Sequence, residues 1–306
     1  MRSKRMVTDR SGSNDLEQRS VARIVTAHRQ QEGAGFTVRR PFPAAGLDMI
    51  DPFLLLDEMG PAEYGPGEAT GAPDHPHRGF ETVTYVLEGE TEHEDSAGHR
   101  GRIGPGDVQW MTAGAGIVHS EMPARRIRER GGRVHGFQLW VNLPARLKMT
   151  RPRYQEIPAE RIPQARTGDG RVQVSVIAGQ ALGVSAVIDT HTPIIYQDWT
   201  LEGGAGVVQS IPGSHRACIY VFAGSVHIGT RRAEVGDGQL AVLGEGSAVS
   251  LHVPDNAPAP ARLLVLAGTP IGEPVARQGP FVMNTREELY RAFVDYQSGR
   301  MGSIER

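Results

Sequence analysis

TYVLEGE, at residues 84–90, is a β-prone run that ends at a glycine turn, and a similar run, IYVFAGS, returns at residues 219–225. A second pair follows in the same order. GDVQWMTAGAG at 106–116 and GDGQLAVLGEG at 236–246 share a Gly-Asp-x-Gln that is followed by Gly-x-Gly at the same offset. Two matches in one order indicate a β-module that is used twice. We therefore expect a second copy to begin somewhere in 150–200.

Short β-prone runs continue along the whole chain, which contains 38 glycines and 21 prolines. Strands this frequent, broken by Gly and Pro turns, predict an all-β sandwich or barrel. Residues 285–298 differ, because Thr285 and Glu288 have the spacing of a capping box and Gly299 is placed as a C-cap. With apolar residues on one face, this segment is predicted to be a C-terminal α-helix that covers the sheet. Partner binding is an alternative use of the helix.

The composition excludes several classes of protein. At 306 residues the chain can bury a sizeable core, and its length suggests two domains. Lys and Arg total 33 against 35 Asp and Glu, so charge gives no argument for direct nucleic-acid or membrane binding. No stretch approaches the ~18–20 apolar residues that span a bilayer. The single cysteine, Cys218, lies in the apolar run ACIYVF and is predicted to be a core residue of a cytoplasmic protein.

The first twenty residues, MRSKRMVTDRSGSNDLEQRS, form a polar segment with mixed charge. They lack the apolar stretch of a secretory signal. We expect residues 1–20 to be a solvated, disordered tail. A nucleic-acid-binding arm is the alternative, which the mixed charge does not favour.

Two histidines flank a proline in PDHPHRGF, at residues 73–80. In an extended strand residues i and i+2 face the same way, so His75 and His77 can present both imidazoles to one side. Pro76 fixes its own φ and favours extended backbone at the residue before it. A His-x-His pattern alone is weak evidence for a metal site.

A second pair with the same spacing, His119 and Glu121, follows the Gly-rich turn in TAGAGIVHSEMP at 112–123. Three imidazoles and one carboxylate are a suitable ligand set for a divalent first-row metal, with positions left open for substrate. The second copy of the module provides an internal control. Its equivalent positions are Ser210, Pro212, Val249 and Leu251. Because the module is repeated without these ligands, they point to function and not to a requirement of the fold.

Other titratable residues are predicted to have structural roles. Glu81 has the strand parity of His77 and is expected to orient a ligand or to be a solvated charge, with a fifth ligand as the less favoured reading. His93 and His99 are expected in turns or on the surface, and His135 either there or near a pocket mouth. The histidines of the second half are expected to be structural; they are His191, His215, His227 and His252.

Several stretches of this sequence resemble the pirin family of the cupin superfamily. They are PDHPHRGFETVTYVLEG, GDVQWMTAGAGIVHSEMP, HGFQLWVNLP, KMTRPRYQ and GPFVMNT. The resemblance runs from about residue 20 to about residue 302 and is strongest in the first half. It implies a bicupin, in which two double-stranded β-helix (jelly-roll) barrels are followed by a short C-terminal helix.

The resemblance also implies how the two barrels differ. Residues 21–150 would form an N-terminal cupin domain with one metal ion, and residues 151–306 a C-terminal cupin domain without metal that includes the helix 285–298. The family's metal ligands fall on the four residues already singled out: His75, His77, His119 and Glu121.

The activity that the resemblance implies is that of quercetin 2,3-dioxygenase, usually with iron. A flavonol would bind the metal through its 3-hydroxyl and carbonyl, react with O₂ and release carbon monoxide, with Glu121 accepting the hydroxyl proton as catalytic base. Manganese, nickel, copper and zinc suit the same ligands. The alternative is a non-enzymatic, iron-dependent redox cofactor of a transcription regulator or metabolic enzyme, with a protein partner. A third reading is a metal that acts on another small molecule. We expect a monomer.

Overall fold

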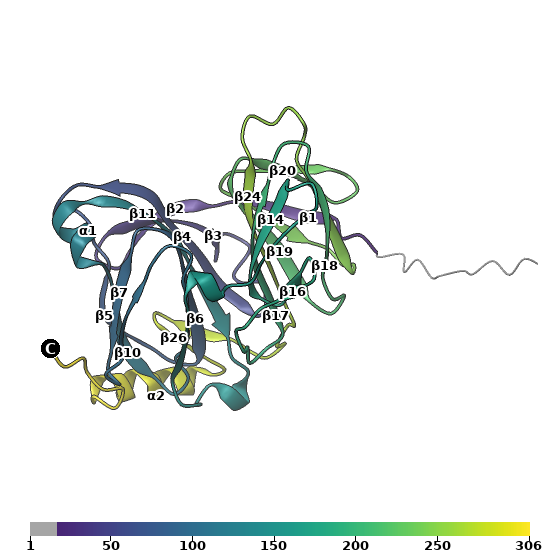
Figure 1. Cartoon of the computed structure of the whole chain (residues 1–306). Coiled ribbons are helices and arrows are strands. Elements are labelled where there is room, and N and C mark those ends of the chain that lie inside the picture. Colours follow the sequence, from purple (N-terminus) through teal and green to yellow (C-terminus); the bar gives the residue numbers. More distant parts are fainter. Residues whose placement is uncertain (1–16) are drawn as a thin grey trace, which may run out of the picture.

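The computed structural model describes residues 17–306, which form two β-barrels side by side (Figure 1). Each barrel combines one seven-stranded sheet with one four-stranded sheet, and both sheets are antiparallel. The prediction of an all-β protein with two barrels is confirmed.

The first barrel holds most of the N-terminal half of the chain. Its large sheet runs, in spatial order, β12 (Arg153–Ile157), β9 (Val108–Thr112), β6 (Phe80–Glu88), β11 (Gly132–Asn142), β4 (Phe53–Tyr64), β3 (Phe36–Phe42) and β2 (His28–Glu32). Its small sheet runs β5 (Ala72–His77), β10 (Ile117–Pro123), β7 (Thr91–Asp95) and β8 (Arg100–Ile103). A short helix, α1 (Arg125–Arg130), leads into β11. Two 3₁₀ turns, at Ala145–Leu147 and Ala159–Arg161, flank β12.

The second barrel repeats this arrangement. Its large sheet runs β1 (Val21–Thr26), β22 (Gln239–Leu243), β19 (Arg216–Ala223), β24 (Ala261–Gly268), β17 (Ile194–Leu201), β14 (Val172–Ala178) and β13 (Gln164–Arg166). Its small sheet runs β18 (Gly206–Ser210), β23 (Ala248–His252), β20 (Ser225–Ile228) and β21 (Ala233–Gly236). Two hairpins complete the strands: β15 (Gln180–Ala181) with β16 (Val184–Ser185), and β25 (Ala276–Gln278) with β26 (Phe281–Met283).

The strand order explains the repeat in the sequence. β6 and β19, which carry the TYVLEGE and IYVFAGS runs, hold the same place in their sheets. The two Gly-Asp-x-Gln motifs lead into β9 and β22, which pair with β6 and β19 respectively. The predicted repetition of one β-module is confirmed.

A segment near each end of the described residues, 17–306, crosses to the other barrel. In Figure 1 the purple strand β1 lies among the green strands of the second barrel, where it pairs with β22. The yellow helix α2 (Arg286–Gln297) lies along the first barrel, where Leu289 packs in one apolar cluster with Val118 of β10. The division at residue 150 remains a prediction. However, two segments lie in a different barrel from the one predicted. Residues 21–26 were assigned to the first barrel but pair with the second, and the C-terminal helix was assigned to the second but packs on the first.

The physical reason is that each barrel leaves an apolar or unpaired edge that the distant segment covers. β1 supplies the outer strand that β12 supplies in the first barrel. Arg19, which lies in the predicted tail, is also buried, and its guanidinium donates to the carbonyls of Gly244, Pro212 and His215. The tail prediction therefore extends too far at this end, and its remainder, residues 1–16, lies outside the described residues.

The C-terminal helix has the predicted cap. Thr285 accepts a hydrogen bond from the Glu288 backbone N–H at 3.2 Å, and the Glu288 carboxylate accepts one from the Thr285 N–H at 3.0 Å. This capping box satisfies two of the amide groups that a helix start leaves unpaired. No helix within residues 17–306 has the length and apolar character needed to cross a membrane.

A mixed apolar and polar interface joins the two barrels. One buried cluster contains Phe137 and Trp110 of the first barrel together with Cys218 and Tyr220 of the second. Cys218 is fully buried, as predicted, and burial raises the pKa of its thiol. Within this interface the carboxylate of Glu58 accepts hydrogen bonds from both barrels.

Candidate metal centre

Two antiparallel neighbours, β5 and β10, carry the predicted ligands. His119 lies directly opposite His75 in the strand pairing, and Ile117 lies opposite His77. The register shifts between His119 and Glu121, which indicates a bulge at this place in β10. Side chains directly opposite in an antiparallel pair share a face, so the pairing brings His75 and His119 together.

The three imidazoles converge on one point. Ligand nitrogens of His75, His77 and His119 all lie within 4.8 Å of one another. The Nε2 atoms of His75 and His77 are 3.1 Å apart. Three nitrogens at these separations could surround a single metal ion.

The protonation of the histidines fits a cation at this point. Nδ1 of His75 lies 2.7 Å from the Pro73 carbonyl and Nδ1 of His77 lies 3.3 Å from that of Pro280, which favours N–H at both Nδ1 atoms. The two Nε2 lone pairs then face each other. Burial, followed by the neighbouring His75, lowers the pKa of His77 and His119 well below the usual value, so both rings are neutral. A neutral imidazole with a free lone pair is the form that binds metals.

His119 provides the most direct test of whether a metal ion fits. Its side chain is 1% exposed, and neither Nδ1 nor Nε2 has a hydrogen-bond partner in the described structure. A buried polar atom without a partner costs about 1–3 kcal/mol. A metal ion bound to one nitrogen of His119 would remove this cost for that nitrogen. The residues present therefore suit a metal ion.

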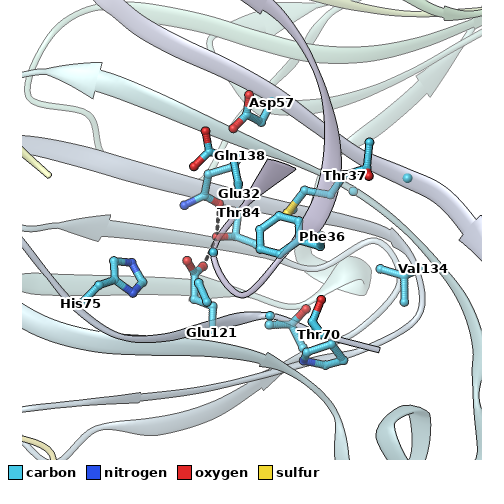
Figure 2. Close-up of a pocket in the computed structure, with 18 of the residues that line it drawn as sticks. Glu32, Phe36, Thr37, Asp57, Thr70, His75, Thr84, Glu121, Val134 and Gln138 are labelled. Carbon is cyan, nitrogen blue, oxygen red and sulfur yellow. Dashed lines mark hydrogen bonds between the residues drawn. The ribbon is translucent and has the colours of Figure 1, made fainter. Parts of the chain in front are cut away.

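Glu121 lies at the edge of the histidine cluster. Its Oε2 is 3.9 Å from Nε2 of His119, while Oε1 accepts a 2.9 Å hydrogen bond from the Thr84 hydroxyl. The same hydroxyl lies 2.7 Å from Oε1 of Gln138, and Figure 2 shows this chain of contacts beside His75. Since a hydroxyl has one proton to donate, Thr84 can serve only one of these two oxygens.

The cluster opens on a cavity of about 640 Å³ inside the first barrel. The half-buried Trp140, from β11, lines it next to His77, with ring centroids 5.2 Å apart. Farther along the wall are two ion-paired residues, Arg40 and Asp57. Met59 also lines the cavity. Other lining residues, labelled in Figure 2, include Phe36, Thr37, Thr70, Thr84, Val134 and Gln138. Cavities of roughly 300–1,000 Å³ are typical of small-molecule sites.

The second barrel has no metal-binding side chain at the positions that correspond to the four predicted ligands, which are Ser210, Pro212, Val249 and Leu251. Val249 and Leu251 are buried in its core, and Val249 pairs with Gln209. Within residues 17–306, His75, His77 and His119 form the one group of three potential metal-binding side chains.

Glu81 was expected to orient a ligand or to be solvated, and both readings are wrong. It is 1% exposed and accepts a 2.6 Å hydrogen bond from the Thr112 hydroxyl. The break at Gly79, with φ of +88°, resets the alternation between β5 and β6. Glu81 therefore points away from the cavity that Thr84 lines, and its carboxylate lies 4.0 Å from Nε2 of His191.

Glu81→Gln is expected to weaken the pH dependence of the free energy of unfolding. Burial raises the pKa of Glu81 from 4.5 to about 7, so the folded chain keeps a proton that the unfolded chain releases. The retained proton on Glu81 contributes roughly 2–4 kcal/mol to the free energy of unfolding. This contribution is fully present below pH ~4.5 and is lost as the pH rises through ~7. Glutamine has no such proton and still accepts from Thr112. Urea unfolding at pH 5 and pH 8 measures the difference, and an equal loss in both proteins would contradict this account.

His93 was expected in a turn or on the surface, and this is wrong. Its side chain is buried, and Nε2 lies 2.7 Å from the Glu156 carboxylate. His93 lies on β7, directly opposite Glu121 in the strand pairing. The residues around His93 in the sequence do not predict this contact between strands. His99 is 61% exposed, as predicted. His135 is buried, lines the cavity and contacts Glu58 at 2.9 Å, in agreement with the alternative of a position near the pocket.

Comparison with known proteins agrees with this architecture. The pirin family model matches residues 35–141, and the model of the pirin C-terminal cupin domain matches residues 196–302. Pirin of Rattus norvegicus is 45% identical over 287 residues, which cover 93% of this chain and 94% of that protein. A pirin-like protein of Solanum lycopersicum is 45% identical over 285 residues, covering 93% of each chain.

A solved structure extends the match to the whole fold. The crystal structure of quercetin 2,3-dioxygenase from Acinetobacter baumannii superimposes with a TM-score of 0.87 at 37% identity, covering 94% of this chain and 100% of that one. Both barrels are thus of the cupin type, and the motif resemblance is borne out by family models that match both halves. The chain belongs to the pirin family.

Proposed function

We propose that this protein is a metal-dependent dioxygenase of the quercetin 2,3-dioxygenase type. The observation that carries the proposal is the convergence of three imidazoles on the wall of a substrate-sized cavity. His75, His77 and His119 would hold the ion, with Glu121 as the fourth ligand. The ion proposed is Fe²⁺, although manganese, nickel, copper and zinc suit the same donors. When bound, it would acidify the hydroxyl of a flavonol and promote its reaction with O₂.

The residues around the cluster have roles that follow from their positions. Trp140 lines the cavity beside His77 and would give a planar ligand an apolar contact there. Glu121 would accept the proton of the substrate hydroxyl, since its Oε2 faces the cluster. When the Thr84 hydroxyl donates to Oε1 of Glu121 and not to Gln138, it fixes the direction of the carboxylate.

The proposal is tested by elemental analysis of protein purified without added metal, followed by an aerobic assay with quercetin. We expect about one metal ion per chain, oxygen consumption and carbon monoxide release. Protein that lacks metal would overturn the proposal. Metal-loaded protein that fails to turn over quercetin and co-purifies with a partner would instead favour a non-enzymatic, iron-dependent regulatory role.

Glu121→Gln is expected to lower kcat for quercetin by about 10²–10⁴-fold, the usual contribution of a positioned general base. Glutamine retains an oxygen that can accept from Thr84, but it cannot take the substrate proton. Metal content is measured in parallel, so that loss of the base is distinguished from loss of the ion. A variant that keeps both its metal and its turnover would show that Glu121 is not the base.

A further inference from the structure

Arg277 reaches the cavity from the far end of the chain. It lies on β25, in the segment that crosses from the second half of the chain to the first barrel, where Arg277, Gly279 and Pro280 line the cavity. β26 of the same hairpin follows, and Phe281 bridges to Arg78, next to His77. The first barrel thus has a cavity wall that its own strands do not supply.

The guanidinium of Arg277 has few partners. Its Cζ lies 4.8 Å from the ring centroid of Trp140, and Nη1 donates to the Leu54 carbonyl at 3.1 Å. Among the described residues, no carboxylate lies within ion-pair distance of it. Arg40, on the same wall, is fully engaged by comparison, because Nε bonds to Asp57 at 2.6 Å and Nη2 pairs with Glu32 at 2.7 Å. Arg277 is therefore a cation with unused donors.

Trp140 links Arg277 to the histidine cluster. The indole contacts His77 at 5.2 Å between centroids and carries the guanidinium at 4.8 Å. A planar aromatic molecule whose reacting group is bound at the histidines and whose body lies along Trp140 would extend towards Arg277. Arginine retains its positive charge under physiological conditions and matches the geometry of a carboxylate with two parallel donors.

We propose that Arg277 anchors an anionic group at the end of the substrate remote from the histidine cluster. This inference rests on the proposed function and narrows its substrate class to planar hydroxylated aromatics that carry a carboxylate or an acidic phenol at that end. A charge-assisted hydrogen bond to such a group contributes about 1.5–3 kcal/mol, or roughly 10–100-fold in affinity.

The test compares 3-hydroxyflavone with its 4′-carboxylate and 7-carboxylate derivatives. Binding to the metal-loaded protein is measured by calorimetry without oxygen, so that turnover does not interfere. We expect one carboxylate isomer to bind wild type at least ~10-fold more tightly than the parent. Arg277→Gln should abolish this preference, and Arg277→Lys should keep part of it. As a matched control, Arg166→Gln removes an exposed arginine of β13 and should change nothing, because within residues 17–306 its guanidinium bonds only to Gln173.

The outcomes separate this inference from the proposed reaction. Equal binding of all three compounds to wild type, or a preference that survives in Arg277→Gln, would overturn the role of Arg277. If the preference for one carboxylate isomer is lost in His119→Ala but kept in Arg277→Gln, the carboxylate binds at the histidines. That result would also overturn the role of Arg277. If the preference depends on Arg277 but oxygen produces no turnover of any compound, the anchor stands and the dioxygenase reaction is wrong.

Discussion

Replacing His119 with valine is expected to abolish metal binding while leaving the barrel folded. The variant removes one of three convergent nitrogens. Loss of a residue that only hydrogen-bonds to a metal ligand already lowers metal affinity by up to ~100-fold, so loss of a ligand itself should lower it by at least that much. Quercetin turnover should fall with it. Valine is the residue at the equivalent position of the second barrel, Val249, which is fully buried. Its apolar side chain also removes two buried nitrogens that have no partner in the described structure.

Metal content by elemental analysis and stability by thermal unfolding together measure this result. His99→Ala, in the same barrel but with an exposed side chain, is the matched control and should keep its metal. We expect the metal-free His119→Val protein to unfold at a temperature no lower than metal-free wild type. A His119→Val protein that retains a full equivalent of metal would show that the ion binds elsewhere.

The sequence singled out three histidines that the fold brings together, but it did not predict the path of the chain between the barrels. His75, His77 and His119 follow from strand alternation and from comparison of the two modules, because both signals are local. Glu121 was placed in the same set, and the structure puts its carboxylate beside the cluster with one oxygen held by Thr84. That hydrogen bond depends on the pairing of β6 with distant strands, so no local pattern reports it.

The errors have a common physical origin in long-range pairing. β1 and α2 cross between the barrels, and no periodicity within either segment tells which barrel it covers. Glu81 points away from the cavity because of a turn at one glycine, and this inverts the parity of the whole strand. Arg277 belongs to a three-residue strand far from the ligands, and only the packing of the hairpin shows that it reaches the cavity.

Glu58→Ala is expected to be the most destabilising single change at the junction of the barrels. The Glu58 carboxylate, on β4, is fully buried and accepts from the Arg39 guanidinium at 2.8 and 2.7 Å. It also accepts a 2.6 Å bond from the hydroxyl of Tyr220, which belongs to the second barrel, and contacts Nε2 of His135 at 2.9 Å. Alanine would leave the Tyr220 hydroxyl and Nε of Arg39 without their acceptor, although Asp237 would still pair with Arg39. Breaking a buried ion pair in this way typically costs about 3–5 kcal/mol.

The free energy of unfolding from urea titration measures this cost. Glu63→Ala, at an exposed position of the same strand, is the matched control and should change stability by less than ~0.5 kcal/mol. Glu58→Gln should fall between them, because the amide keeps one acceptor but places an N–H against donors. A loss below about 1 kcal/mol in Glu58→Ala would mean that water replaces the carboxylate. The apolar cluster around Phe137 and Tyr220 would then hold the barrels together without this ion pair.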